Sequence, residues 1–195
     1  MNSTKSLPNT YKLCGTCYLS HPKIAVGLNM VATLLLAFWG MVFLKIAAGL
    51  RPEVNEVQVR INPLSILLFV ALSIFSIVLH ELVHGLFLGV FTRERPRFGF
   101  TGLWAYASSP GWYIPRNQYL VIALAPFVLI TLGGVGLLWL LPFSAVLPVV
   151  LVMALNAAGA SGDLLLTGWI LTCAKVKFVS ETNTLDVTLY EEVDK

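Results

Sequence analysis

The chain has 195 residues, of which 57% are hydrophobic and only 12% are charged, and its mean hydropathy is +0.80. A soluble domain needs about twice that charged fraction to cover its surface, so this composition excludes an ordinary soluble globular protein. The net charge of +3 is explained by basic residues near anionic head groups and gives no reason to invoke nucleic acid as a partner.

Four apolar segments are long enough to cross the membrane as helices, which takes about 20 residues. They are residues 24–44, 64–91, 119–141 and 144–173. The first is interpreted as an uncleaved signal anchor, because no short apolar core with a cleavage site comes before it. We therefore expect an all-α integral membrane protein with four transmembrane helices, surrounded by lipid, and a short interfacial β-rich segment between the second and third helices.

The basic residues predict how the chain is oriented in the cell membrane. With four spans both termini share one side, and that side carries ten of the 13 lysines and arginines. We therefore expect a multi-pass protein with both termini in the cytoplasm. The predicted parts are a cytoplasmic amino tail at 1–23, a transmembrane domain at 24–173 and a cytoplasmic carboxy tail at 174–195.

Two cysteines in the amino tail form a C-x-x-C pair, Cys14 and Cys17, with His21 four residues further on. Such a pair can bind a metal or cycle its redox state. A single pair in a reducing compartment is more often a pair of inert thiols. The sequence leaves both interpretations open.

Two loop segments show the alternation of a strand. Residues 54–61 in the first loop predict a short strand to which we attach no function. Residues 97–107 predict a strand or hairpin, within a segment rich in aromatic residues, glycine and proline. This segment is either an interfacial aromatic belt or an exposed strand edge that receives an unwound substrate by strand addition. The carboxy tail predicts two short strands around 181–183, or disorder.

The most informative motif is H-E-x-x-H, formed by His80, Glu81 and His84 inside the second apolar segment. Four residues apart on a helix, the two imidazoles point about 40° apart and can reach one Zn²⁺. Glu81 is rotated about 100° from His80, beside the metal, where a general base belongs. A carboxylate at mid-membrane costs roughly 2.5 to 3.5 kcal/mol, so an idle Glu81 would be a liability.

Asp163 is the remaining ionisable residue in a predicted span and therefore the candidate third ligand. It lies about as far from the cytoplasmic end of its span as the two histidines do, some 13 to 15 Å at 1.5 Å per residue. One Zn²⁺, two carboxylates and two neutral imidazoles sum to zero charge, which removes the penalty of buried unpaired acids.

Small residues fill the stretch directly before Asp163, from Ala157 to Gly162. We expect a kink or break there that brings Asp163 to the metal. Asn156 lies about two turns before Asp163 and either holds a substrate carbonyl or oxyanion, or makes an interhelical hydrogen bond. Glycines 85 and 89 predict that another helix packs closely against the metal-bearing one.

The chain resembles the putative zincin peptidase family of bacterial membrane proteins and, more distantly, the site-2 class of intramembrane metalloproteases. The resemblance rests on "HELVHGLFLGV" from His80, "QYLVIALAPF" from Gln118 and "NAAGASGDLL" from Asn156. It implies a zinc-dependent metalloendopeptidase with His80, His84 and Asp163 as ligands and Glu81 as base. Site-2 proteases carry prolines between the asparagine and a D-G pair, whereas here glycine and alanine replace the prolines and Leu164 follows the aspartate.

The leading hypothesis is an intramembrane zinc metalloprotease that hydrolyses peptide bonds in a transmembrane or membrane-proximal protein segment. Three alternatives remain open. A G-x-S-G match at 159–162 fits a serine protease, but no histidine follows residue 84 to activate Ser161. The four ionisable residues could also form the relay of a metal or proton carrier. The third alternative is a catalytically inert membrane regulator with the same fold.

Overall fold

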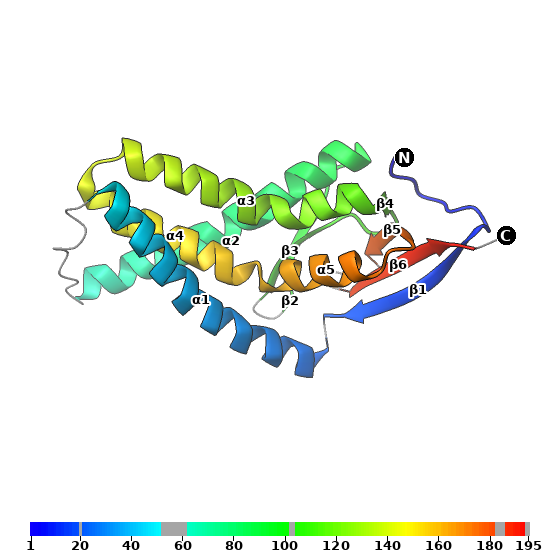
Figure 1. Cartoon of the computed structure of the whole chain (residues 1–195), viewed down its shortest axis with the longest axis horizontal. Helices are drawn as coiled ribbons and strands as arrows, with labels where there is room; N and C mark the ends of the chain where they lie inside the picture. The colour runs from blue at the N-terminus through cyan, green and yellow to red at the C-terminus, as the bar shows by residue number, and fades with distance from the viewer. Residues whose placement is uncertain (20, 52–61, 102–103, 182–185, 194–195) are drawn as a thin grey trace. The chain divides into compact units, whose positions relative to one another are not determined.

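The computed structural model of the chain describes residues 1–19, 21–51, 62–101, 104–181 and 186–193. Its helices are α1 (Pro22–Leu50), α2 (Pro63–Thr92), α3 (Arg116–Leu140), α4 (Val146–Gly159) and α5 (Ser161–Thr172), with a short 3₁₀ turn η2 (Phe143–Ala145) before α4 (Figure 1). Its strands are β1 (Tyr11–Tyr18), β2 (Arg97–Thr101), β3 (Trp104–Ser108), β4 (Tyr113–Pro115), β5 (Val176–Glu181) and β6 (Asp186–Glu192). Each predicted span is helical, and the fourth is divided between α4 and α5.

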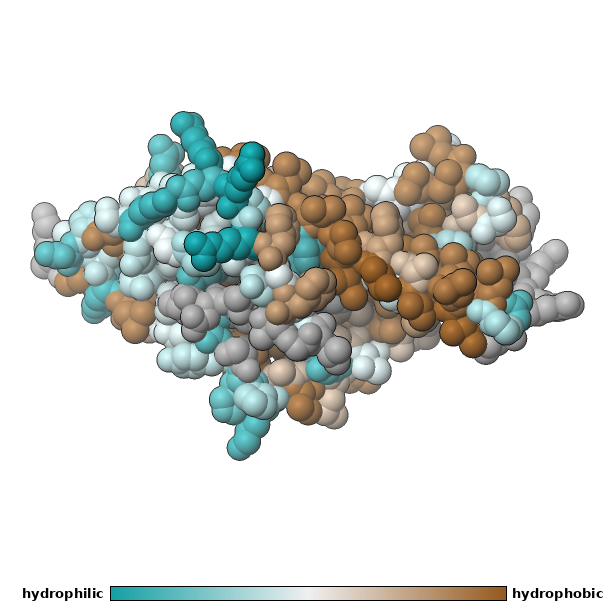
Figure 2. Space-filling model, turned by 180° about the vertical axis from the view of Figure 1, so that it is seen from behind, coloured by the Kyte–Doolittle hydropathy of each residue, from teal (hydrophilic) through white to brown (hydrophobic). Residues whose placement is uncertain are grey.

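Three helices, α1, α2 and α3, are long and apolar enough to cross a membrane. The bent pair of η2–α4 and α5 adds a fourth crossing if it is counted as one span. In the most apolar windows of α1 and α2 only 11% of the residues are buried within the chain, so most of their side chains need an apolar surrounding. Figure 2 shows broad areas of hydrophobic side chains, in brown, at the molecular surface. The chain is therefore a multi-pass membrane protein, as predicted.

The prediction of an all-α fold was wrong, because both tails contribute strands to a sheet. Strands β1, β6, β5 and β4 form a four-stranded antiparallel sheet in that order, and β1 pairs with β6 from Tyr11↔Glu192 to Tyr18↔Asp186. This pairing joins the two ends of the chain, and neither tail taken alone reveals it. The strands expected in the carboxy tail are confirmed as β5 and β6.

The aromatic segment forms the predicted hairpin, in which β2 pairs with β3 from Arg97↔Ser108 to Thr101↔Trp104. The strand predicted for residues 54–61 lies outside the described residues.

The chain divides into two compact units, and each has its own core. Unit 1 comprises Met1–Leu28, Glu81–Ala125 and Gly162–Lys195, and unit 2 comprises Asn29–His80 and Pro126–Ser161. Unit 1 holds both sheets and a buried cluster that includes Leu88, Tyr119, Ile122, Leu166, Ile170 and Val179. Unit 2 is helical, with a buried cluster that includes Phe43, Leu138, Val150 and Met153. Each of the four boundaries along the chain falls within a helix, in α1, α2, α3 and α5.

In unit 1 the sheet ties the start of α3 to the end of α5. Strand β4 leads directly into α3, β5 follows shortly after α5, and the two strands pair antiparallel with Pro115 opposite Phe178. Arg116 adds a second tie, because its Nη2 donates to the carbonyl oxygen of Ile170 over 3.3 Å. The first turns of α3 and the body of α5 are therefore held together.

The expected break before Asp163 is confirmed. Helix α4 ends at Gly159, α5 begins at Ser161, and the two axes differ by 45°. The last turn of α4 closes with a hydrogen bond from the amide of Ala160 to the carbonyl oxygen of Asn156 (3.0 Å). Asp163 therefore lies in the first turn of a new helix, where the helix dipole favours a carboxylate.

The expectation of a helix against Gly85 and Gly89 was wrong, because the segment leading into the hairpin occupies that face of α2. A Cβ at residue 85 would overlap the ring of Phe98, and Pro96 lies near both glycines. Close helix packing is found instead at Gly134 of α3, where a Cβ would overlap the side chain of Met153 from α4.

The contact between Gly134 and Met153 gives a stability prediction. Met153 is fully buried in the core of unit 2, so Gly134→Ala should destabilise the protein by about 1 to 3 kcal/mol through overpacking. The adjacent Gly133 has open space around it, so Gly133→Ala should be neutral or slightly stabilising. Thermal unfolding of both variants in detergent measures the difference, and equal midpoints for the two would contradict the close approach.

Candidate metal centre

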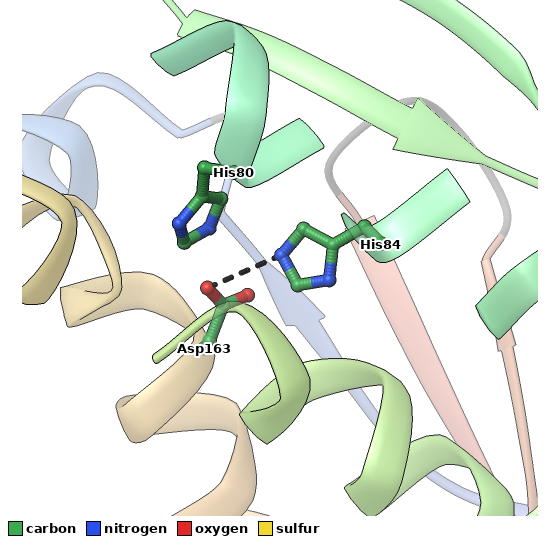
Figure 3. Close-up of side chains that lie close together, drawn as sticks. All are labelled: His80, His84 and Asp163. Carbon is green, nitrogen blue, oxygen red and sulfur yellow. Dashed lines mark ion pairs between the residues drawn. The ribbon is translucent and has the colours of Figure 1, made fainter. Parts of the chain in front are cut away.

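His80, His84 and Asp163 come together as a group that could hold a metal ion. One donor atom from each residue lies within 4.8 Å of the donors of the other two. Both histidines are buried, with 8% and 9% of their surfaces exposed, while Asp163 is partly buried. The histidines lie on consecutive turns of one helix, α2, which fixes their spacing, and Figure 3 shows the Asp163 carboxylate beside both rings.

The environment of His84 determines which ring nitrogen carries the proton. Its Nδ1 lies 2.9 Å from the carbonyl oxygen of Ile122 on α3. A carbonyl oxygen only accepts hydrogen bonds, so Nδ1 must donate. The neutral ring of His84 therefore presents the lone pair of Nε2, as metal ligation requires.

The same tautomer follows for His80, through Asn156. The Nδ2 amide of Asn156 donates to the carbonyl oxygen of Pro126 over 3.3 Å, which fixes the orientation of the amide group. Its Oδ1 therefore faces Nδ1 of His80, at 3.0 Å, and accepts a hydrogen bond from it. The interhelical hydrogen bonds considered for Asn156 are thus present, and its contact with a substrate carbonyl or oxyanion stays a prediction.

Opposite these donors, Nε2 of His84 lies 3.4 Å from Oδ2 of Asp163 (Figure 3, dashed line). A lone pair and a carboxylate oxygen are both acceptors, so a cation must be shared between them, either a proton or a metal ion. Two donors each about 2.1 Å from a tetrahedral zinc ion lie about 3.4 Å apart. The donor set of two imidazole nitrogens and one carboxylate oxygen also matches that of catalytic zinc sites, so the residues fit this metal.

Glu81 follows His80 directly on α2 and is partly buried. The 100° rotation per residue turns it away from the direction of His80. It is not part of the group of three candidate ligands among the described residues. The role of Glu81 as a general base stays a prediction.

Sequence reasoning missed one acidic residue of unit 1, Glu181 at the end of β5. The residue as a whole is partly exposed, but protein atoms surround its carboxyl group, which accepts a hydrogen bond from the amide of Ser109 (2.9 Å) and one from the hydroxyl of Tyr119. Burial raises the pKa of this carboxyl group to about 7, although Ser109, His84 and Tyr119 each lower it. The sequence signal that could have identified Glu181 is its place as an acidic residue at the end of a strand with alternating apolar residues.

The three cysteines are free thiols. Cys14 and Cys17 both lie on β1, and burial, followed by neighbouring acids, raises the pKa of each. A raised pKa keeps a thiol protonated at neutral pH and makes it a poor nucleophile, which favours the interpretation as inert thiols.

Comparison with known proteins identifies the family. The model of a family described as "putative zincin peptidase" matches residues 73–178, which is more than half of the 195 residues. The chain belongs to this family. The matched region contains His80, Glu81, His84 and Asp163. No curated protein and no solved structure matches the chain.

The role of Asn156 can be tested through zinc affinity in this zincin family member. Asn156→Ala removes the acceptor that orients His80, and loss of such a partner typically weakens metal binding 10- to 100-fold. Competition with a chelator of known affinity measures the loss. Ser76→Ala is the matched control, because the Ser76 hydroxyl makes another hydrogen bond from α2 to α4, to the carbonyl oxygen of Val152 (3.3 Å). Equal losses of zinc affinity in both variants would show that Asn156 contributes only to general packing.

Glu181 predicts a pH dependence of stability in the metal-free protein. With a folded pKa of about 7 against an ordinary 4.5, the folded state binds more protons than the unfolded state between these values. Stability should therefore fall as the pH rises through this window, by up to about 3 kcal/mol. Glu181→Gln should remove this fall.

Unfolding in detergent at several pH values between 5 and 8 measures the effect. Glu94→Gln is the control, because Lys5 and Trp112 lower the pKa of the exposed Glu94 and keep it ionised throughout that range. If the wild type and Glu181→Gln show the same pH dependence, the carboxyl group of Glu181 does not titrate there.

Proposed function

We propose that this protein is a zinc-dependent metalloprotease that hydrolyses peptide bonds in or near membrane segments of a protein substrate. The observation that carries the proposal is the convergence of His80, His84 and Asp163, with both imidazoles held in the tautomer that exposes a ligand lone pair. Membership of the zincin family supports the same chemistry.

His80, His84 and Asp163 would hold the zinc ion, and zinc supplies Lewis-acid chemistry that polarises a carbonyl and acidifies water. Glu81 acts as the general base: it takes a proton from the attacking water and then delivers it to the amine that leaves when the peptide bond breaks. The backbone carbonyl of Ile122 and the side-chain carbonyl of Asn156 fix the tautomers of His84 and His80. The Nε2 lone pairs of the two histidines are therefore kept directed at the centre. Asp163 supplies negative charge that offsets part of the charge of the cation.

The hairpin β2–β3 is our candidate for the substrate-binding element. Phe98 of β2 packs on Gly85, directly after His84, so the hairpin lies close to the centre along unit 1. Among the described residues no third strand joins this two-stranded sheet. Its outer edge is suited to accept an extended segment by strand addition after local unwinding of a substrate helix.

We further propose that both termini lie in the cytoplasm. The pairing of β1 with β6 supports a common side for the two tails. The excess of lysine and arginine on that side, in both tails and in the segment between α2 and α3, favours the cytoplasm.

The proposal predicts a separation between metal binding and activity. Purified wild-type protein should contain about one zinc per chain, which His80→Ala and Asp163→Ala should lose. Glu81→Gln should retain the zinc but lose activity by at least about 100-fold, because general base catalysis contributes 10²- to 10⁴-fold.

Metal analysis by mass spectrometry and cleavage of a panel of transmembrane peptides in proteoliposomes measure the two properties. Glu94→Gln serves as a control with an exposed carboxylate lost elsewhere. Zinc transport into liposomes without cleavage of any peptide would favour a carrier instead. Cleavage that survives chelation but is lost in Ser161→Ala would favour a serine enzyme.

A further inference from the structure

Pro126 lies inside α3, in the middle of a membrane-spanning helix. A proline there removes one helical hydrogen bond, because it has no amide proton to donate to the carbonyl of the residue four positions earlier, and its ring pushes that carbonyl aside. The residue four positions before Pro126 is Ile122. Its carbonyl oxygen is the group that accepts the Nδ1 hydrogen bond of His84.

Pro126 also contributes through its own carbonyl oxygen. This oxygen accepts the amide hydrogen bond of Asn156, and Asn156 in turn accepts the Nδ1 hydrogen bond of His80. One proline is therefore connected to both histidines, to His84 through the carbonyl that it leaves available and to His80 through Asn156. The side chain of Pro126 is fully buried, so its position is fixed by its surroundings.

We propose that Pro126 is a positioning residue that sets the tautomer and orientation of His84 through the Ile122 carbonyl, while its own backbone carbonyl orients Asn156, the partner of His80. This inference rests on the proposed function for its purpose, which is to present two Nε2 lone pairs to a zinc ion. The inference itself concerns the hydrogen bonds of the two imidazoles, which form with or without the metal.

Replacing Pro126 with alanine tests the first connection. Alanine restores an amide proton at residue 126, which competes with His84 for the Ile122 carbonyl and draws that carbonyl back into the helix. Zinc affinity should fall about 10-fold, as expected for loss of a partner that orients a ligand. The helix itself should be at least as stable, because alanine is a better helix former than proline.

Nitrogen NMR of metal-free protein, with ¹⁵N-labelled histidine, provides a readout that does not depend on activity. The chain has three histidines, so the signals can be assigned by single substitutions. In the wild type the signals of His84 should show protonation at Nδ1. In Pro126→Ala they should shift because the hydrogen bond from Nδ1 to the Ile122 carbonyl is weakened or lost.

Two further variants separate the effect of the amide proton at residue 126 from the effect of the shape of the proline ring. An α-hydroxy acid at position 126 replaces the amide with an ester and, like proline, has no amide proton, so it should restore both the zinc affinity and the His84 signals. Pro148→Ala is the matched control, because Pro148 lies in the first turn of α4, where its missing amide proton leaves no helical bond unmade. It should leave both readouts unchanged.

The inference is overturned if Pro126→Ala leaves the His84 signals unchanged, or if the ester variant behaves like the alanine variant. A wild-type protein that binds no zinc would overturn the proposed function instead. In that case the nitrogen signals of the metal-free protein alone decide the role of Pro126.

Discussion

The constraint on which the site depends is the cost of placing a carboxylate and two imidazoles among apolar helices. A charged group in that setting costs several kcal/mol unless another charge or a set of hydrogen bonds compensates for it. Asp163 meets this requirement by facing His84, and the two histidines meet it by donating from Nδ1 to fixed acceptors. One donor atom from each of the three residues lies within 4.8 Å of the other two, so together they could hold a cation.

The fold serves this arrangement through two interruptions of regular helix. The break between α4 and α5 starts a new helix two residues before Asp163, so its carboxylate benefits from the helix N-terminus. The proline within α3 makes a backbone carbonyl available for a side chain. Both irregularities lie within segments that are apolar enough to span a membrane, where loosened backbone groups are tolerated only if other protein groups satisfy them. In α3, His84 and Asn156 bond the carbonyl oxygens of Ile122 and Pro126, and at the end of α4 the amide of Ala160 bonds the carbonyl oxygen of Asn156.

Sheet formation supports the same geometry within unit 1. The pairing of β4 with β5 holds the start of α3 against the end of α5, and these helices carry Ile122 and Asp163. The buried cluster of Ile122, Leu166 and Ile170 packs the two helices together. A candidate carboxylate ligand and the carbonyl that orients a histidine are therefore positioned by one sheet and one core, which favours a rigid arrangement.

The sequence by itself determined the membrane class, the helical spans and the three candidate ligands. These follow from local signals: the length of apolar runs, the four-residue spacing of His80 and His84, and the cost of an acid such as Asp163 in lipid. Only the tertiary structure revealed the sheet between the tails, the hairpin against Gly85 and the hydrogen bonds of Asn156. Each of these joins residues far apart in the chain. Strand pairing and backbone hydrogen-bond acceptors depend little on residue type, so the sequence does not predict them. Even Pro126, visible in the sequence as a helix irregularity, acquires its role only when α2 supplies an imidazole to the carbonyl of Ile122.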